Sequence, residues 1–239
     1  MIELRCGSWE EVLSDVFSVD ALLTDPPYGA KTHDGQRHRR HGEKHGDHKL
    51  NARGLEYECW VPEIVDRFVR TWSARTRGWM ACMTSHDLIP AYEAAYLAAG
   101  RYGFAPLSCV QENMNIRLAG DGPSNWTTHL MVARPRTREY STWGTLRGAY
   151  HGPPTDPGEN LLDRSKRPVA GGKPMWLMRA IIRDYTRSGD LVCDPCAGGG
   201  TTLLAAAIEG RRAIGAELDP KTFTKAVARL ARGYTPTLI

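Results

Sequence analysis

The chain has 239 residues, enough to bury a core as one domain, and a formal net charge of +4 at neutral pH. Its six cysteines lack the spacing of a disulfide framework, and no secretory or membrane-spanning segment is evident. These features exclude a small disulfide-stabilised secreted domain and a membrane-spanning protein, and they favour a compact cytosolic one.

Strands and helices alternate along the chain, which is typical of a mostly parallel sheet with helices on both faces. In chain order we expect a strand at 19–23, a helix at 63–69, a strand at 78–83, a helix at 87–99, strands at 104–112 and 127–133, a helix from 174, a strand at 191–194, a helix at 201–209, a strand at 213–215 and a helix at 221–231. The strands at 104–112 and 127–133 are interpreted as the final pair of the sheet, with the last one antiparallel.

The first of these strands is followed at once by Asp25, Pro26, Pro27 and Tyr28. Each proline fixes φ and lacks an N–H group, which leaves carbonyls of the turn able to accept hydrogen bonds. A carboxylate, an acceptor carbonyl and an aromatic ring together suit a planar heterocycle that carries an exocyclic amino group. Asp-Pro-Pro is also a common turn after a strand, so these four residues alone leave that ordinary explanation open.

A second motif spans residues 189–202, where a buried strand leads through a glycine turn into a helix. Glycines let the backbone approach a ligand, and a helix N-terminus offers unpaired N–H groups. The next strand ends in Glu217, and an acid at this place commonly binds ribose hydroxyls in nucleotide folds. Asp219 suits the cap of the following helix, with Pro220 at its first position. A glycine turn alone also fits a dinucleotide enzyme.

Together the two motifs resemble those of the DNA amino-methyltransferases, which methylate adenine N6 or cytosine N4. Residues 25–28 resemble the catalytic motif, and residues 194–202 resemble the loop that binds S-adenosylmethionine (AdoMet). The catalytic motif comes first by about 170 residues, which is the permuted order of the family's β group. The resemblance covers about residues 1–30, 60–134 and 170–232. It implies one Rossmann-like α/β catalytic domain over residues 1–239, with a seven-stranded, mostly parallel sheet in circularly permuted order.

The resemblance also assigns roles to single residues. Asp25 and the Pro26 carbonyl would accept the N–H bonds of the target amino group, Pro27 completes the turn, and Tyr28 would stack on a flipped base. Lys173 begins a segment that resembles the family's Lys-Pro helix, which packs beside the cofactor. The expected cofactor-binding residues are Asp194, Cys196, Gly198, Gly200, Thr201, Thr202, Glu217 and Lys173. The family usually has Gly-Asp where this chain has Gly7 and Ser8, which weakens the case for an adenine-ring contact there.

Two groups of residues raise the question of a metal site. Cys193 and Cys196 form a CxxC pair, but the second CxxC of a zinc ribbon is missing and the pair lies in the cofactor turn. Four histidines at 38, 41, 45 and 48 could share a helical face, but arginines lie between them and no acid or cysteine anchors the group. We therefore expect no metal.

Residues 31–53 carry seven Lys/Arg against three Asp/Glu, which equals the net charge of the whole chain. This stretch lacks the apolar residues needed for a core of its own. It is either a solvated loop or part of a basic flap, residues 31–59, that closes on DNA phosphates around a flipped base. Its expected DNA contacts are Arg37, Arg39, Arg40 and Lys44.

Residues 135–170 form a second basic region with interspersed aromatic residues, at the place where the family has its target-recognition segment. Part of it reads as a Pro/Gly-rich linker. The expected contacts to double-stranded DNA are Arg136, Arg138 and Arg147. Because the segment is short, we expect one of two arrangements. Either the DNA site is short, or its recognition is shared with the basic flap or with a second subunit of a homodimer.

The sequence thus favours an AdoMet-dependent adenine-N6 DNA methyltransferase acting in a bacterial or phage-infected cytoplasm, with no membrane partner. Asp rather than Ser before Pro-Pro-Tyr favours adenine within the permuted group. Cytosine-N4 methylation, methylation of an RNA base, and a nucleic-acid-binding protein without catalysis remain alternatives. The protein could belong to a restriction–modification system, act as an orphan enzyme or be encoded by a phage, and the sequence does not distinguish these settings.

Overall fold

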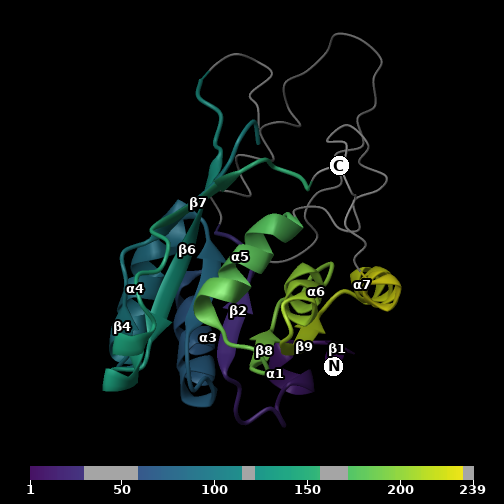
Figure 1. Ribbon diagram of the computed structural model, residues 1–239, viewed down its shortest axis with the longest axis horizontal. Coiled ribbons are helices and arrows are strands. Elements are labelled where there is room, and N and C mark those ends of the chain that lie inside the picture. Colours follow the sequence, from purple (N-terminus) through teal and green to yellow (C-terminus); the bar gives the residue numbers. More distant parts are fainter. Residues whose placement is uncertain (30–58, 115–121, 157–171, 234–239) are drawn as a thin grey trace.

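The computed structural model describes residues 1–29, 59–114, 122–156 and 172–233 (Figure 1). In chain order the elements are β1 (Ile2–Cys6), α1 (Trp9–Val12), β2 (Ala21–Thr24), α3 (Pro62–Arg75), β3 (Met80–Thr84), η2 (His86–Leu88), α4 (Ile89–Ala98), β4 (Tyr102–Gly103), β5 (Leu107–Gln111), β6 (Thr127–Arg134), η3 (Arg138–Thr142), β7 (Ala149–Gly152), α5 (Met175–Tyr185), β8 (Leu191–Asp194), α6 (Thr201–Ile208), β9 (Arg212–Glu217) and α7 (Pro220–Arg232). Most of the basic flap, residues 31–58, lies outside the described residues.

The strands form a single sheet, in the order β1-β9-β8-β2-β3-β6-β5-β7, with β4 beside β6. The neighbours from β1 to β3 are all parallel, and β6 is antiparallel to both β3 and β5. The path from β1 to β5 contains seven strands, the number that the resemblance implies, and one of them is antiparallel as expected. The short strands β4 and β7 add to it, so 104–112 and 127–133 are not the last strands of the sheet. β7 lies within residues 135–170, the expected recognition segment, so part of that segment belongs to the sheet.

Helices cover both faces of the sheet, as the alternating elements predict, and side chains of each central strand point alternately into two cores. In β2, Ala21 and Leu23 face the core shared with α5 and α6, whereas Leu22 faces the core shared with α3 and α4. Figure 1 shows α5 and α6 in front of the sheet and α3 beside it. Burial on both faces explains why the central strands are continuous apolar runs rather than alternating ones.

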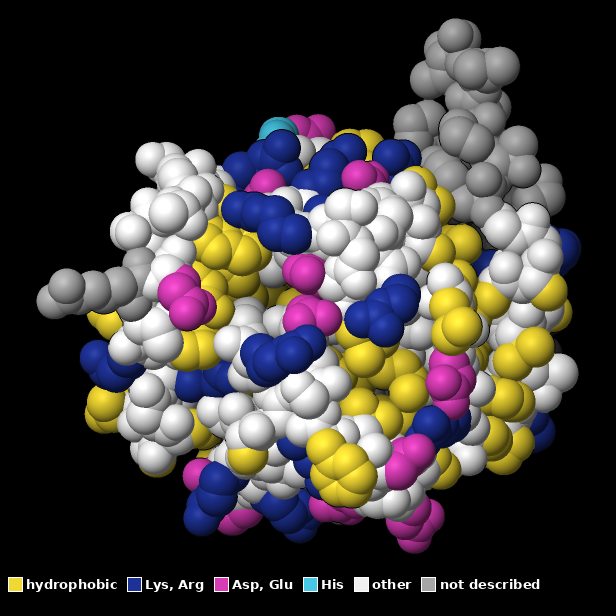
Figure 2. Space-filling view, turned by 60° about the horizontal axis from the view of Figure 1, so that its bottom comes forward, with side chains coloured by type: hydrophobic (Ala, Val, Ile, Leu, Met, Phe, Trp, Pro, Cys, Tyr) yellow, Lys and Arg dark blue, Asp and Glu magenta, His cyan; other side chains and the backbone are white. Residues whose placement is uncertain are grey.

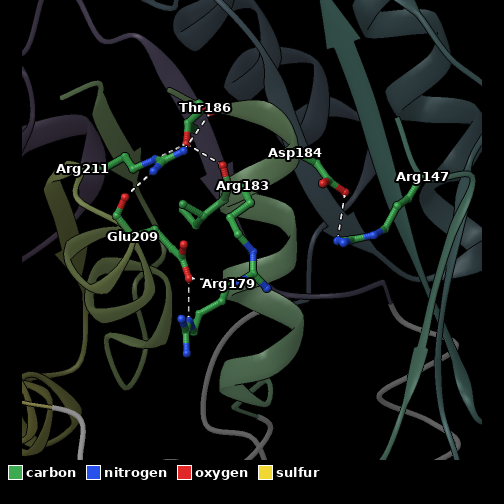
Figure 3. Close-up of polar contacts among 8 residues, drawn as sticks. Arg147, Arg179, Arg183, Asp184, Thr186, Glu209 and Arg211 are labelled. Carbon is green, nitrogen blue, oxygen red and sulfur yellow. Dashed lines mark hydrogen bonds and ion pairs between the residues drawn. The ribbon is translucent and has the colours of Figure 1, made fainter. Parts of the chain in front are cut away.

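α5 is held by polar contacts on both of its flanks (Figure 3). Arg179 donates to Glu209, at the end of α6, over 2.6 Å. On the other flank, Asp184 accepts from the Tyr150 hydroxyl of β7 at 2.8 Å and from Arg147 at 3.4 Å. These contacts fix α5 between the cofactor-like half of the chain and the strand β7.

Among the described residues, no helix is long and apolar enough to cross a membrane.

Candidate active site

The two sequence motifs meet because β2 and β8 are neighbours in the sheet. Their parallel register pairs Ala21 with Val192 and Leu22 with Cys193, so both strands end at the same edge. There the Thr24 hydroxyl donates to Asp194 Oδ1 at 2.6 Å, in a buried contact between residues 170 positions apart. Ligands of open α/β sheets bind at this carboxyl edge. The structure therefore places Asp25 and the glycine turn side by side.

The Asp25 carboxylate is contacted on both of its oxygens. The Tyr28 hydroxyl donates to Oδ1 at 2.8 Å, and the Lys173 ammonium donates to Oδ2 at 2.6 Å. The Lys173 nitrogen also lies 4.9 Å from the centroid of the Tyr28 ring. Lys173 was expected to contact the cofactor; in the structure it contacts Asp25 and Tyr28 of the catalytic motif.

Strand β3 supports the catalytic turn from its other side. The backbone N–H of Gly29 donates to Ser85 Oγ at 3.0 Å, directly after β3 ends. A Cβ atom added to Gly29 would lie 2.2 Å from Asp87 Oδ2, so a larger residue here would require the Asp87 side chain to move. Sequence reasoning did not single out Ser85 or Asp87. Their position just after a buried parallel strand was the signal that could have found them.

The glycine turn leads from β8 into α6 in a conformation that requires glycine. Gly198 and Gly200 have φ values of 51° and 75°, in the left-handed region. The Ala197 N–H donates to the Ala216 carbonyl at 2.8 Å, which ties the turn to β9. The start of α6 therefore presents backbone N–H groups at the edge where β2 ends.

The side chains of this turn point inward and shape it. Asp194 is 1% exposed, and besides Thr24 it accepts from the Cys196 N–H at 3.1 Å. Burial raises the pKa of the Asp194 carboxyl to about 6, although hydrogen bonds from Thr202 and Thr24 oppose this rise. Thr201 is also buried, and it accepts from Arg229 of α7 at 2.7 Å. Asp194, Thr201 and Thr202 thus organise the loop, and Arg229 is a supporting residue that the sequence did not reveal.

Two acids lie at the end of β9 and just beyond it, and the structure separates their roles. Glu217 lies at the end of β9, beside the glycine turn, where burial raises the pKa of its carboxyl. Its Oε1 accepts from the Asp219 N–H at 2.9 Å. Asp219 caps α7 by accepting from Lys221 N and Thr222 N, with Pro220 in the first turn. The predicted capping role of Asp219 is confirmed.

The turn after β1 lies at the same edge of the sheet, and Ser8 acts there as a cap. Its side chain accepts from the Glu10 N–H at 3.3 Å at the start of α1. Gly7 donates its N–H to the Glu217 carbonyl at 2.9 Å, which brings this turn to the border of the site.

The CxxC pair sits in the floor of the glycine turn. Cys193 is buried in β8, and burial raises the pKa of the Cys193 and Cys196 thiols well above their ordinary value. Metal ligation and redox chemistry both use the thiolate, which this environment disfavours. Among residues 1–29, 59–114, 122–156 and 172–233, no group of His, Cys, Asp and Glu could hold a metal ion.

The arginines of segment 135–170 that were expected to contact DNA are not gathered at the active site. Because β6 runs antiparallel to β3, its last residues pair with the beginning of β3, at the edge away from Asp25. Arg136 follows β6 there and lies over the Tyr102 ring, 5.6 Å from its centroid. Arg138 begins η3 in the same region, and Arg147 pairs with Asp184. This placement does not support a contact from Arg136 to a base held at Asp25. Arg37, Arg39, Arg40 and Lys44 lie outside the described residues.

The lower side of the molecule carries charges of both signs. When the lower edge of Figure 1 is turned toward the viewer, Lys/Arg side chains are seen intermingled with Asp/Glu (Figure 2). At the edge of the sheet where β2 and β3 begin, Arg77 and Asp20 form an ion pair at 2.6 Å. Mixed charge of this kind is typical of a solvated surface rather than of a basic footprint for nucleic acid.

Comparison with known proteins links the chain to DNA methylases. Residues 150–228 match the N6_N4 family model, described as DNA methylase. A type II methyltransferase, M.MthZI of Methanothermobacter thermautotrophicus, is 43% identical over 61 residues. That stretch is 26% of this chain and only 17% of the relative.

Solved structures show that the fold is shared over nearly the whole chain. The complex of M1.HpyAVI with SAM has a TM-score of 0.67 at 21% identity, covering 96% of this chain and 99% of that one. A Thermus thermophilus protein assigned as a DNA modification methylase, complexed with S-adenosyl-L-methionine, gives 0.63 at 21% identity, covering 97% and 94%. The cytosine-N4-specific PvuII DNA methyltransferase gives 0.66 at 14% identity, covering 95% and 85%. The chain therefore has the fold of the AdoMet-dependent methyltransferases.

Proposed function

We propose that this chain, whose residues 150–228 match the DNA methylase family, transfers a methyl group from AdoMet to adenine N6 in DNA. The observation that carries the proposal is the Thr24–Asp194 contact of 2.6 Å, because it puts the Asp-Pro-Pro-Tyr turn next to the glycine turn. A base-binding turn and a cofactor turn at one sheet edge are what a direct transfer between two bound molecules requires.

The residues around the glycine turn fit AdoMet. The positive φ values of Gly198 and Gly200 leave backbone N–H groups at the start of α6, and half-buried Glu217 supplies a carboxylate for ribose hydroxyls. The conformation of the turn would be maintained by Asp194, Thr201 and Thr202. Cys196 would contribute to the cofactor site as a residue of the turn itself. When bound, AdoMet supplies an electrophilic methyl group on a sulfonium.

At the other half of the site, Asp25 would bind and align the target amino group. The amino nitrogen of adenine is a poor nucleophile because its lone pair is delocalised into the ring. If Asp25 and the Pro26 carbonyl accept its two N–H bonds, the nitrogen is drawn toward tetrahedral geometry and its lone pair becomes available. Tyr28 would stack on the flipped base, and Pro27 keeps the turn rigid. Alignment and exclusion of water would supply most of the rate.

The choice of adenine rests on Asp25, since the corresponding residue within the permuted group leans to Ser for cytosine. The likeness to a cytosine-N4-specific enzyme makes cytosine N4 the second candidate for the methylated atom. A base in RNA is the third candidate. Double-stranded DNA would be held by the basic flap, with Arg147 and a second subunit as further contributors. The permuted order of the β group fits the position of β2 before β8 in the chain.

Tritium transfer from AdoMet tests the proposal directly. The purified protein is incubated with double-stranded DNA, single-stranded DNA and RNA, and the product is digested to nucleosides. N6-methyladenine in the DNA digest is the expected product. N4-methylcytosine would move the assignment to the second candidate, label in RNA alone would change the substrate class, and no label in any substrate would leave a non-catalytic binding protein.

A further inference from the structure

Lys173 was expected to bind the cofactor, but its surroundings in the structure indicate a role at the catalytic turn. Its side chain is 9% exposed, and its ammonium lies 2.6 Å from Asp25 Oδ2. The two residues are 148 positions apart, so the contact depends on the packing of α5 against the sheet. A nearly buried ammonium on a part-buried carboxylate is costly unless its geometry is well satisfied.

The backbone at Lys173 is fixed by the cap of α5. Asp156 accepts from Met175 N at 2.6 Å and from Trp176 N at 2.9 Å, so one carboxylate satisfies two N–H groups of the first turn. Pro174 is the N-cap residue, with φ of −65°, which restricts the chain directly after Lys173. Together with the contacts of Arg179 and Asp184 on the flanks of α5, this cap gives the Lys173 side chain a rigid base (Figure 3).

The Asp25 carboxylate is consequently clamped from two directions. Tyr28 holds Oδ1 and Lys173 holds Oδ2, and the two donors belong to opposite halves of the chain. An ionised carboxylate has about four acceptor positions, so two contacts leave room for an N–H bond of a target amino group. Lys173 and the target amino group are both donors, and the carboxylate has enough acceptor positions to bind the two at once.

We propose that Lys173 is a positioning residue, which acts through Asp25 by fixing the direction in which the carboxylate accepts the target amino group. This inference rests on the proposed function. Lys173 contacts neither cofactor nor base in this role. Its effect is on the alignment of the nucleophile, and a displacement of about 1 Å in such a group costs on the order of 100-fold in rate.

The test compares Lys173→Met, which keeps the length of the side chain without its charge, with Lys173→Arg, which restores a cationic donor. Steady-state tritium transfer gives kcat and KM, and calorimetry gives AdoMet affinity. We expect Lys173→Met to lose on the order of 10- to 100-fold in kcat, with unchanged AdoMet affinity and unchanged KM for DNA. Lys173→Arg should recover a substantial part of kcat. Lys225→Met, on the exposed side of α7, is the matched control and should behave as wild type.

Other outcomes overturn the inference in distinguishable ways. Weaker AdoMet binding with normal kcat at saturation would make Lys173 a cofactor ligand. Tighter DNA binding or faster turnover in Lys173→Met would mean that the ammonium obstructs the base. A Lys173→Arg variant as slow as Lys173→Met would mean that the exact side chain matters for packing and not for donation to Asp25.

Two further comparisons keep these results interpretable. Thermal unfolding identifies a loss of fold, and if Lys173→Met is unfolded at the assay temperature, Lys173→Gln takes its place with the same expectation. An inactive wild-type protein on every nucleic acid would refute the proposed function, and the inference would fall with it. An active wild type with an equally active Lys173→Met would refute the inference alone.

Discussion

Thr24 and Asp194 lie 170 residues apart, yet the Thr24 hydroxyl donates to Asp194 Oδ1 at 2.6 Å in the interior of the sheet. The contact joins the strand that carries the base-binding turn to the strand that carries the glycine turn. Both strands are covered by helices on both faces, so this buried carboxylate has little access to water. Its protonation is consequently coupled to folding.

The first prediction concerns this coupling. The folded-state pKa of Asp194, about 6, exceeds the ordinary 3.8, so between these values the folded state binds more protons than the unfolded state. The stability contribution of Asp194 is therefore greatest below about pH 4 and is lost as pH rises through 6. Relative to Asp194→Asn, wild type should lose up to roughly 3 kcal/mol of unfolding free energy over this range.

Urea unfolding of both proteins at several pH values between 4 and 7 measures this difference. Asp219→Asn is the control. Hydrogen bonds from Thr222 lower the pKa of the Asp219 carboxyl below 3.8, so its contribution to stability stays nearly constant between pH 4 and 7 and is lost only at more acid pH. A constant difference between wild type and Asp194→Asn would contradict the raised pKa.

The second prediction concerns catalysis. Asp25→Ala should leave AdoMet binding nearly intact while kcat falls by several orders of magnitude, since its contacts matter mainly in the transition state. Calorimetry with AdoMet and single-turnover methyl transfer separate the two effects. Retention of most activity would remove Asp25 as the acceptor of the amino group.

The third prediction separates the roles of Glu217 and Asp219. Glu217→Ala should weaken AdoMet binding by about 2–3 kcal/mol, because the variant cannot make charge-assisted hydrogen bonds to the ribose. Asp219→Ala removes the cap of α7 and should lower the free energy of unfolding, with little effect on AdoMet affinity. Calorimetry and urea unfolding of both variants check this contrast; equal AdoMet affinity in Glu217→Ala and wild type would place the ribose partner elsewhere.

The fourth prediction concerns the basic flap. Neutralising Arg37, Arg39, Arg40 and Lys44 together should weaken binding to all DNA sequences. It should also flatten the slope of log K against log salt by roughly 0.9 for every DNA phosphate that the flap no longer neutralises. Fluorescence anisotropy at several salt concentrations gives both quantities.

The matched control for the flap is Arg136→Gln, at the edge of the sheet away from Asp25, which should leave the salt slope unchanged. AdoMet affinity should stay constant in both variants. A wild-type slope after neutralising the flap would mean that the flap is only solvated. A change in slope for Arg136→Gln would instead give the far edge of the sheet a part in DNA binding.

The sequence by itself determined the α/β class, the places of most strands and helices, and the two motifs. These features are local: apolar runs mark buried strands, glycines mark the turn with positive φ, and Asp219 with Pro220 marks a helix start. The antiparallel direction of β6 was also predicted correctly. The strands β4 and β7 were missed because they are short and form only by pairing with other strands, β4 with the end of β6 and β7 with β5.

Only the tertiary structure decided which side chains share a site. Lys173 and Asp25 meet because α5 packs beside the end of β2, and no local pattern in either segment encodes that contact. Arg136 lies away from the site because β6 is antiparallel to β3, so the residues after β6 lie at the opposite edge of the sheet. The physical reason is the same in both cases: periodicity specifies how a segment folds, whereas strand order and direction specify which ends of the segments meet.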